Sequence, residues 1–73
     1  MKTRRDIKAW NGQIMGSILR DPKTGDEEAR SFFGKILGYY NANRDVTTAF
    51  SGRILAQGNI LSSLITEEFN KNK

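Results

Sequence analysis

The sequence has no cysteine and no histidine among its 73 residues. Without cysteine, no disulfide can form and no thiolate can bind a metal, so the fold must rest on packing. The usual proton shuttles and thiol nucleophiles are also missing, which leaves carboxylates and lysines as general bases. No apolar run is long enough to span a bilayer, and no secretory signal follows the basic N-terminus. We therefore expect a cytoplasmic protein that does not enter the membrane.

Composition favours a small folded domain with an anionic partner. One tryptophan, four phenylalanines and two tyrosines, together with many isoleucines and leucines, are too many apolar residues for a disordered chain. A chain of this length buries a small core, so residues 1–73 are expected to form a single domain. The net charge is +4 and the isoelectric point is about 9.8. Such a charge favours nucleic acid or an acidic protein surface as the partner.

Apolar residues in the first half of the chain recur at the spacing of a helix. Ile7, Trp10, Ile14 and Ile18 lie three or four residues apart and predict a helix over 4–19. The proline at position 22 would end that helix, because proline lacks the amide that a continuing helix needs.

The second predicted helix covers 25–40. Thr24 and Glu27 match a capping box, and the carboxylates of Asp26, Glu27 and Glu28 would stabilise the positive end of the helix dipole. The apolar residues that follow, from Ala29 to Tyr40, form one continuous stripe.

The third and fourth predicted helices cover 46–57 and 60–69. Asp45 would cap the third helix, and Gly58 followed by Asn59 is typical of a helix end with a new cap. One uninterrupted helix over 46–69 is the alternative. We favour a break near Gly58, because it leaves the polar side chains of this stretch exposed.

The predicted fold is therefore all-α, a bundle of three or four short helices that could include a helix–turn–helix. No run alternates apolar and polar residues as a strand does, and no internal repeat is recognised. Residues 1–8 would be a basic arm and 70–73 a frayed tail. The predicted core consists of Trp10, Ile14, Ile18, Phe32, Phe33, Ile36, Leu37, Phe50, Ile54, Leu61, Leu64 and Ile65.

No pattern in the sequence indicates catalysis, so we do not expect an enzyme. The carboxylates at 26–28 have an ordinary function as helix caps, and the serines lack a recognisable base. No loop has the spacing of a calcium site, and the scattered glycines form no phosphate loop. We accordingly expect no cofactor, no metal and no catalytic residue.

Two groups of polar residues are candidates for partner binding. The first is the basic cluster Lys2, Arg4, Arg5 and Lys8, which could contact phosphates or an acidic groove, or could simply aid solubility. The second consists of Arg44, Arg53, Gln57 and Asn59. Arginine and amide side chains read base edges, although an ordinary polar helix corner would have the same composition.

A third candidate is a protein-docking patch formed by Gly34, Gly38 and Tyr39, where small residues would let a partner approach closely. Two functions remain open. The protein could be a DNA-binding regulator, or a phage- or mobile-element-type protein that binds and modulates a larger host machine for transcription or replication. A homodimer is compatible with both hypotheses.

Overall fold

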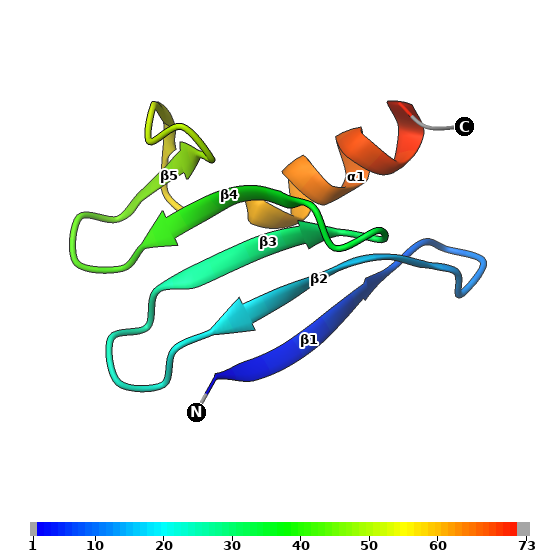
Figure 1. Ribbon diagram of the computed structural model, residues 1–73, viewed down its shortest axis with the longest axis horizontal. Coiled ribbons are helices and arrows are strands. Elements are labelled where there is room, and N and C mark those ends of the chain that lie inside the picture. Colours follow the sequence, from blue (N-terminus) through cyan, green and yellow to red (C-terminus); the bar gives the residue numbers. More distant parts are fainter. Residues whose placement is uncertain (1, 72–73) are drawn as a thin grey trace.

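The computed structural model describes residues 2–71 and shows one antiparallel sheet with a single helix (Figure 1). The strands pair in the order of the sequence, each with the next. The elements are β1 (Thr3–Lys8), β2 (Ile14–Arg20), β3 (Glu27–Ser31), β4 (Ile36–Asn41), β5 (Val46–Ala49), β6 (Ile54–Gln57) and α1 (Leu61–Lys71). The predicted all-α bundle is therefore wrong, and so are the helices expected over 4–19, 25–40 and 46–57.

The helix expected over 60–69 corresponds to α1. The backbone amide of Leu61 donates to Oδ1 of Asn59 at 3.1 Å, so Asn59 caps this helix. Gly58 has φ 86°, a left-handed conformation that turns the chain away from β6 and into the helix. The chain changes direction at Gly58, but both predicted alternatives for 46–69 are wrong, because two strands and not a helix precede this residue. Residues 70–71 of the predicted tail belong to α1, and 72–73, like Met1 of the predicted arm, lie outside the described residues.

Three of the hairpin turns are built alike, over residues 9–13, 31–35 and 49–53. In each, the first amide donates to the fifth carbonyl, at 2.8 Å in all three cases, and the fourth amide donates back to the first carbonyl. The fourth residue is always a glycine in the left-handed region, with φ between 86° and 96°. This is a three-residue turn closed by a glycine, a common hairpin connection. The turns belong to alternate hairpins and therefore lie at the same end of the strands.

A β-bulge follows each of these turns at the same position. The register shifts once in each hairpin, so that Met15, Leu37 and Leu55 have no partner residue on the neighbouring strand. Each bulged residue is preceded by isoleucine and followed by glycine or alanine. The chain thus contains three copies of one structural repeat, over 9–16, 31–38 and 49–56, which the sequence analysis did not recognise.

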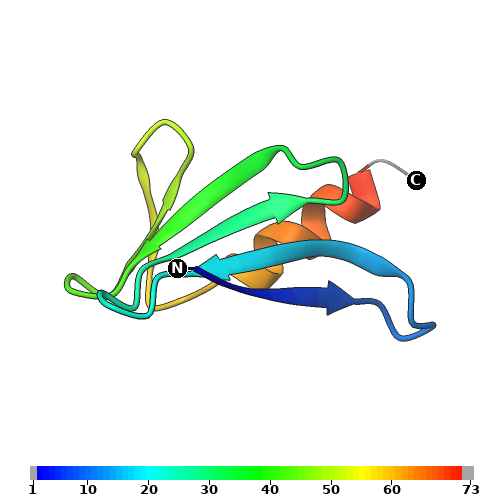
Figure 2. The same ribbon diagram turned by 60° about the horizontal axis from the view of Figure 1, so that its bottom comes forward.

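The helix α1 packs on one face of the sheet, against β2, β3 and β4. Two glycines of the repeat, Gly16 and Gly38, allow this packing, because a side chain at either position would collide with α1. The buried core between the helix and the sheet comprises Met15, Ile18 and Ala29 of the strands and Leu61 and Ile65 of α1. Figure 2 shows that the turn between β5 and β6 stands away from the plane of β1 to β4, so this turn lies outside the core.

Thr47 connects the sheet to the start of α1. This residue is fully buried on β5, and its hydroxyl donates to the carbonyl of Gly58 at 2.6 Å and accepts from the amide of Ile60 at 3.1 Å. These two bonds fix the direction in which the chain leaves β6, because both ends of the short connection are held by one side chain.

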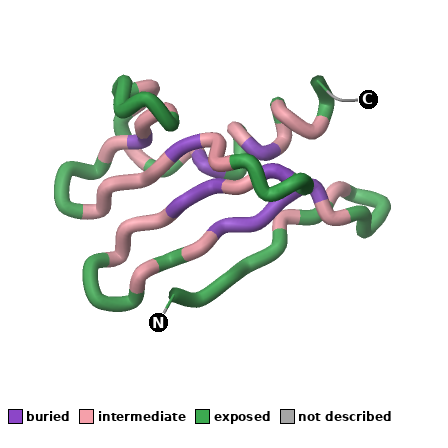
Figure 3. Tube along the Cα trace, viewed as in Figure 1, coloured by how far each residue is buried: buried purple, intermediate pink, exposed green. Residues whose placement is uncertain are grey.

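The edge strand β1 is exposed along almost its whole length (Figure 3). Three of its six residues, Arg4, Arg5 and Lys8, are cationic. An exposed edge offers unpaired amides and carbonyls to other chains, and charged side chains are a common protection against such pairing. The basic cluster therefore lies on an edge strand and not, as predicted, at the start of a helix. Protection of this edge explains its charge.

Candidate functional site

Exposed aromatic rings mark the end of the sheet where the three repeated turns lie. Trp10 is 97% exposed, Phe33 is 80% exposed, and Phe32 and Phe50 are 59% and 64% exposed. Trp10, Phe32 and Phe50 occupy the same position in their turns, directly after the first residue. The prediction that these four residues belong to the core is wrong, as it is for Ile54. Exposed rings at the turns of a small domain are typical of a binding surface, and here the third turn stands apart from the first two (Figures 1 and 2).

Each of these turns also carries a cation within three residues of its exposed ring. Lys8 precedes the first turn, Lys35 ends the second, and Arg53 ends the third. We call the three turns with their rings and cations the turn row, defined as Lys8, Trp10, Phe32, Phe33, Lys35, Phe50 and Arg53. Lys8 and Arg53 form no ion pair with another residue of 2–71. The Lys35 side chain is 70% exposed, and its Nζ lies 4.0 Å from Glu68 Oε2.

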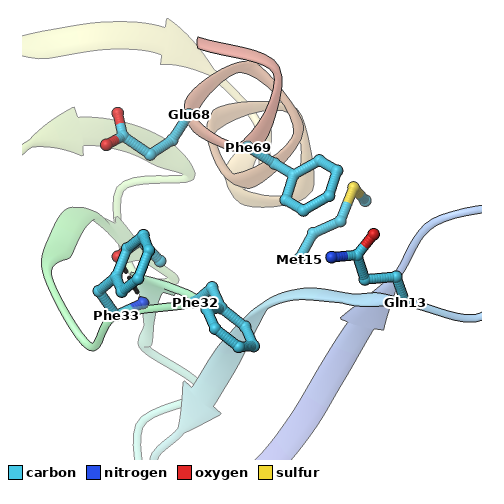
Figure 4. Close-up of a pocket in the computed structure, with 7 residues that line it drawn as sticks. Gln13, Met15, Phe32, Phe33, Glu68 and Phe69 are labelled. Atoms are coloured by element: carbon cyan, nitrogen blue, oxygen red, sulfur yellow. Dashed lines mark hydrogen bonds between the residues drawn. The ribbon is translucent and has the colours of Figure 1, made fainter. Parts of the chain in front are cut away.

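A cavity of about 330 Å³ opens between the first two turns and the C-terminal end of α1 (Figure 4). Its walls are mainly apolar, with Phe32 and Phe33 on one side and Met15 and Phe69 on the other. A second hollow, on the Trp10 side, shares Met15 and Phe69 with the first. The first two turns of the turn row are therefore bordered by two neighbouring hollows, of which the first is mainly apolar.

Only part of the predicted basic cluster lies at the end of the sheet that carries the turn row. Lys8 belongs to the turn row, but Lys2 and Arg4 lie toward the opposite end of the sheet, because Thr3 pairs with Arg20 at the start of β1. Arg4 forms an ion pair with Asp6 at 3.2 Å. Arg5 alternates with Arg4 along the strand and so faces the other side of the sheet.

The second predicted group is dispersed. Arg53 lies in the turn row, Arg44 lies in the turn at the opposite end, and Gln57 ends β6. Asn59 is occupied as the cap of α1, and its Nδ2 donates to Glu27 Oε1 at 2.9 Å. The suggested helix–turn–helix over 45–69 is wrong, since its first half is a hairpin.

The predicted docking patch is not a patch. Gly34 provides the left-handed residue of the second turn, and Gly38 is buried under α1. Tyr39 lies on the opposite face from Gly38, where its ring stacks on Phe50 with 6.4 Å between the centroids. Gly34 is exposed, but Gly38 is covered by α1 and Tyr39 lies on the other face, so the three positions do not form one surface.

The carboxylates at 26–28 have structural functions different from the expected helix cap. Asp26 Oδ1 accepts from the Ala42 amide at 2.8 Å and joins the two turns at the far end of the sheet. Glu28 is buried on β3 and pairs with Arg30 at 2.6 Å. Among residues 2–71, no group of three or more acidic side chains is arranged to hold a metal ion, and no helix is long and apolar enough to cross a membrane.

Tyr40 and Asp45, at the far end of the sheet, provide a test of the local electrostatics. The Tyr40 hydroxyl donates to Asp45 Oδ1 at 2.5 Å, and this hydrogen bond is the main reason that the pKa of Tyr40 is raised above its ordinary value. The stabilisation is complete below the ordinary tyrosine pKa of about 10 and is lost as the pH rises through the raised one.

In the variant Asp45→Asn, we expect the pKa of Tyr40 to fall toward the ordinary range, because the acceptor loses its negative charge. Asparagine tolerates the left-handed φ of 54° at this position, so the turn should persist. The measurement is the tyrosinate absorbance as a function of pH. Identical titration curves for the variant and the natural chain would show that the hydrogen bond has no such effect.

The sequence analysis missed the exposed rings and Lys35, although a signal for them was present. One five-residue pattern recurs around Gly12, Gly34 and Gly52: an aromatic residue, any residue, glycine, a polar residue and isoleucine. Comparisons of this chain with protein-family models, with curated proteins and with solved structures gave no match. The function must therefore be argued from the geometry of the turn row.

Proposed function

We propose that the protein binds single-stranded nucleic acid through the turn row, without catalysis. The observation that carries this proposal is the recurrence, in three equivalent turns, of an exposed ring within three residues of a cation. Unpaired bases stack on aromatic rings while lysine and arginine side chains hold the phosphates. This arrangement is tolerant of sequence, because every base has a face that can stack.

The geometry favours a single strand over a duplex. Rings at the tips of turns need bases whose faces are free, and the bases of a duplex are stacked on one another. A duplex is read along its base edges by a helix or a β-ribbon that enters a groove, and this mode makes no use of exposed ring faces. The one helix of the described chain, α1, is packed on the sheet through Leu61 and Ile65, which are fully buried.

The test removes the three cations of the turn row in the variant Lys8→Gln, Lys35→Gln and Arg53→Gln. We expect weaker binding to a short fluorescein-labelled oligothymidylate, measured by anisotropy over a range of salt concentrations. Each phosphate contact to a single strand contributes about 0.7 to the slope of log affinity against log salt, so three lost contacts should flatten the slope by about two.

The matched control removes three cations from the opposite end of the sheet, in the variant Lys2→Gln, Lys23→Gln and Arg44→Gln. The net charge changes equally, but the slope should stay close to that of the natural chain. Equal effects in both variants would assign the binding to net charge and overturn the proposed site. If the natural chain binds neither single strands nor duplex, the proposed function is wrong and an acidic protein surface becomes the better partner.

A further inference from the structure

The cavity beside the second turn has apolar walls on two sides, as a site for a flat ring would. It is lined by Gln13, Met15, Ser31, Phe32, Phe33, Glu68 and Phe69. Figure 4 shows the Phe32 and Phe33 rings on one side of the opening and Phe69 with Met15 on the other. Phe32 and Phe33 meet edge to face, with 5.4 Å between their centroids, and together form an apolar wall.

The polar groups of the cavity are few and lie near its rim. Ser31 Oγ accepts from the backbone amides of Phe33 and Lys35, both at 3.2 Å, and so is engaged in holding the turn. Glu68 is engaged with Lys35, so the side chain of Gln13 is the polar group of the lining that can meet the edge of a ligand. Small-molecule sites combine a mainly apolar lining with a few such polar groups.

Positive charge beside the cavity indicates the chemistry of its occupant. Lys35 ends the turn that forms one wall, where its Nζ lies 4.0 Å from Glu68 Oε2. Lys8, which forms no ion pair with another residue of 2–71, borders the adjoining hollow that shares Met15 and Phe69. A ligand that is flat and apolar on its faces, polar on its edge and linked to anionic groups on either side would match all three features. A nucleotide within a strand has this combination.

We propose that the cavity takes one unpaired nucleobase, which turns out of the bound strand and enters between the Phe32–Phe33 pair and Phe69. The inference rests on the proposed function and adds to it a defined pocket for a single base. Proteins that bind single strands gain much of their affinity from stacking of this kind. The phosphates on either side of the inserted base would lie toward Lys8 and Lys35.

The first test places a fluorescent reporter in the wall of the cavity. In the variant Phe69→Trp on a Trp10→Phe background, the indole at position 69 is the chain's one tryptophan. We expect oligothymidylate to quench its emission on binding. An abasic oligonucleotide of the same length should bind more weakly and cause no quenching, because it carries the phosphates without the bases.

The second test removes the ring from the same wall. In Phe69→Leu the side chain stays apolar, and we expect the affinity for oligothymidylate to fall about fivefold or more, the lower range for the loss of one stacked base. Circular dichroism checks that both variants fold. If Phe69→Leu does not fold, the quenching measured in the Phe69→Trp variant decides the test. Binding without quenching, or with unchanged affinity in Phe69→Leu, would overturn the pocket and leave the turn row as the site. No binding by the natural chain would overturn both proposals.

Discussion

Replacing Gly16 with alanine should remove most of the stability of the protein. A methyl group at this position would lie 2.8 Å from Ile65 Cγ2 and closer still to the carbonyl oxygen of Arg30. The carbonyl belongs to the paired backbone of β3, and Ile65 is fully buried, so neither can move aside cheaply. We expect a loss of about 3 kcal/mol, at the upper end for overpacked cores. A single core of this size rarely supplies more than about 5 kcal/mol.

The measurement is chemical denaturation followed by circular dichroism. Gly12→Ala is the matched control, because a methyl group there meets nothing within 4 Å while φ is 88°. Its loss should come from backbone strain alone, at about 1 kcal/mol. If Gly16→Ala is no more destabilising than Gly12→Ala, the close approach of α1 to β2 is not a determinant of stability.

Truncation of Ile65 should have an effect of similar size for the opposite reason. Ile65 is fully buried between α1 and the sheet, in contact with the core that includes Met15, Ile18 and Ala29. We expect Ile65→Ala to cost about 2–5 kcal/mol, because it removes buried methyl groups and leaves a cavity. The smaller change Ile65→Val should cost about 0.5–1.5 kcal/mol.

The control for this prediction is Trp10→Ala. It removes the largest side chain of the protein, but that side chain is 97% exposed, so unfolding in denaturant should be nearly unchanged. A large loss in Trp10→Ala, or a negligible one in Ile65→Ala, would contradict the assignment of the core to the helix-covered face. The pair of variants therefore locates the core directly.

The last helix could be predicted from the sequence, whereas the sheet could not. Leu61, Leu64, Ile65 and Phe69 have the spacing of one helix face, and Asn59 is a good cap, so local and tertiary preferences agree there. In the strands, the bulges break the alternation that would reveal them. Ile14 and Ile18 are four residues apart, as in a helix, but the bulge at Met15 places them on opposite faces of the sheet.

The turns explain the other errors. Phe32 and Phe33 continue an apparent helical stripe from Ala29, yet they form the tip of a hairpin, because Gly34 supplies the left-handed residue that closes the turn. A single glycine is a weak turn signal, and its significance here lies in the repetition. Of the candidate binding residues, only Lys8 and Arg53 fall in the turn row, since the cations were grouped by sequence and not by strand end.

The strict neighbour-to-neighbour pairing of the six strands has a consequence for the order of folding. Each hairpin closes between residues adjacent in sequence, and such local contacts form quickly, on the scale of microseconds for an isolated hairpin. The contacts of α1 with β2 span much of the chain and pay a larger loop-closure entropy. During synthesis the sheet can therefore assemble before the helix has emerged. Gly16 and Gly38, on the face that α1 later covers, are then still exposed to water. Docking of α1 would then be the step that completes the folded state.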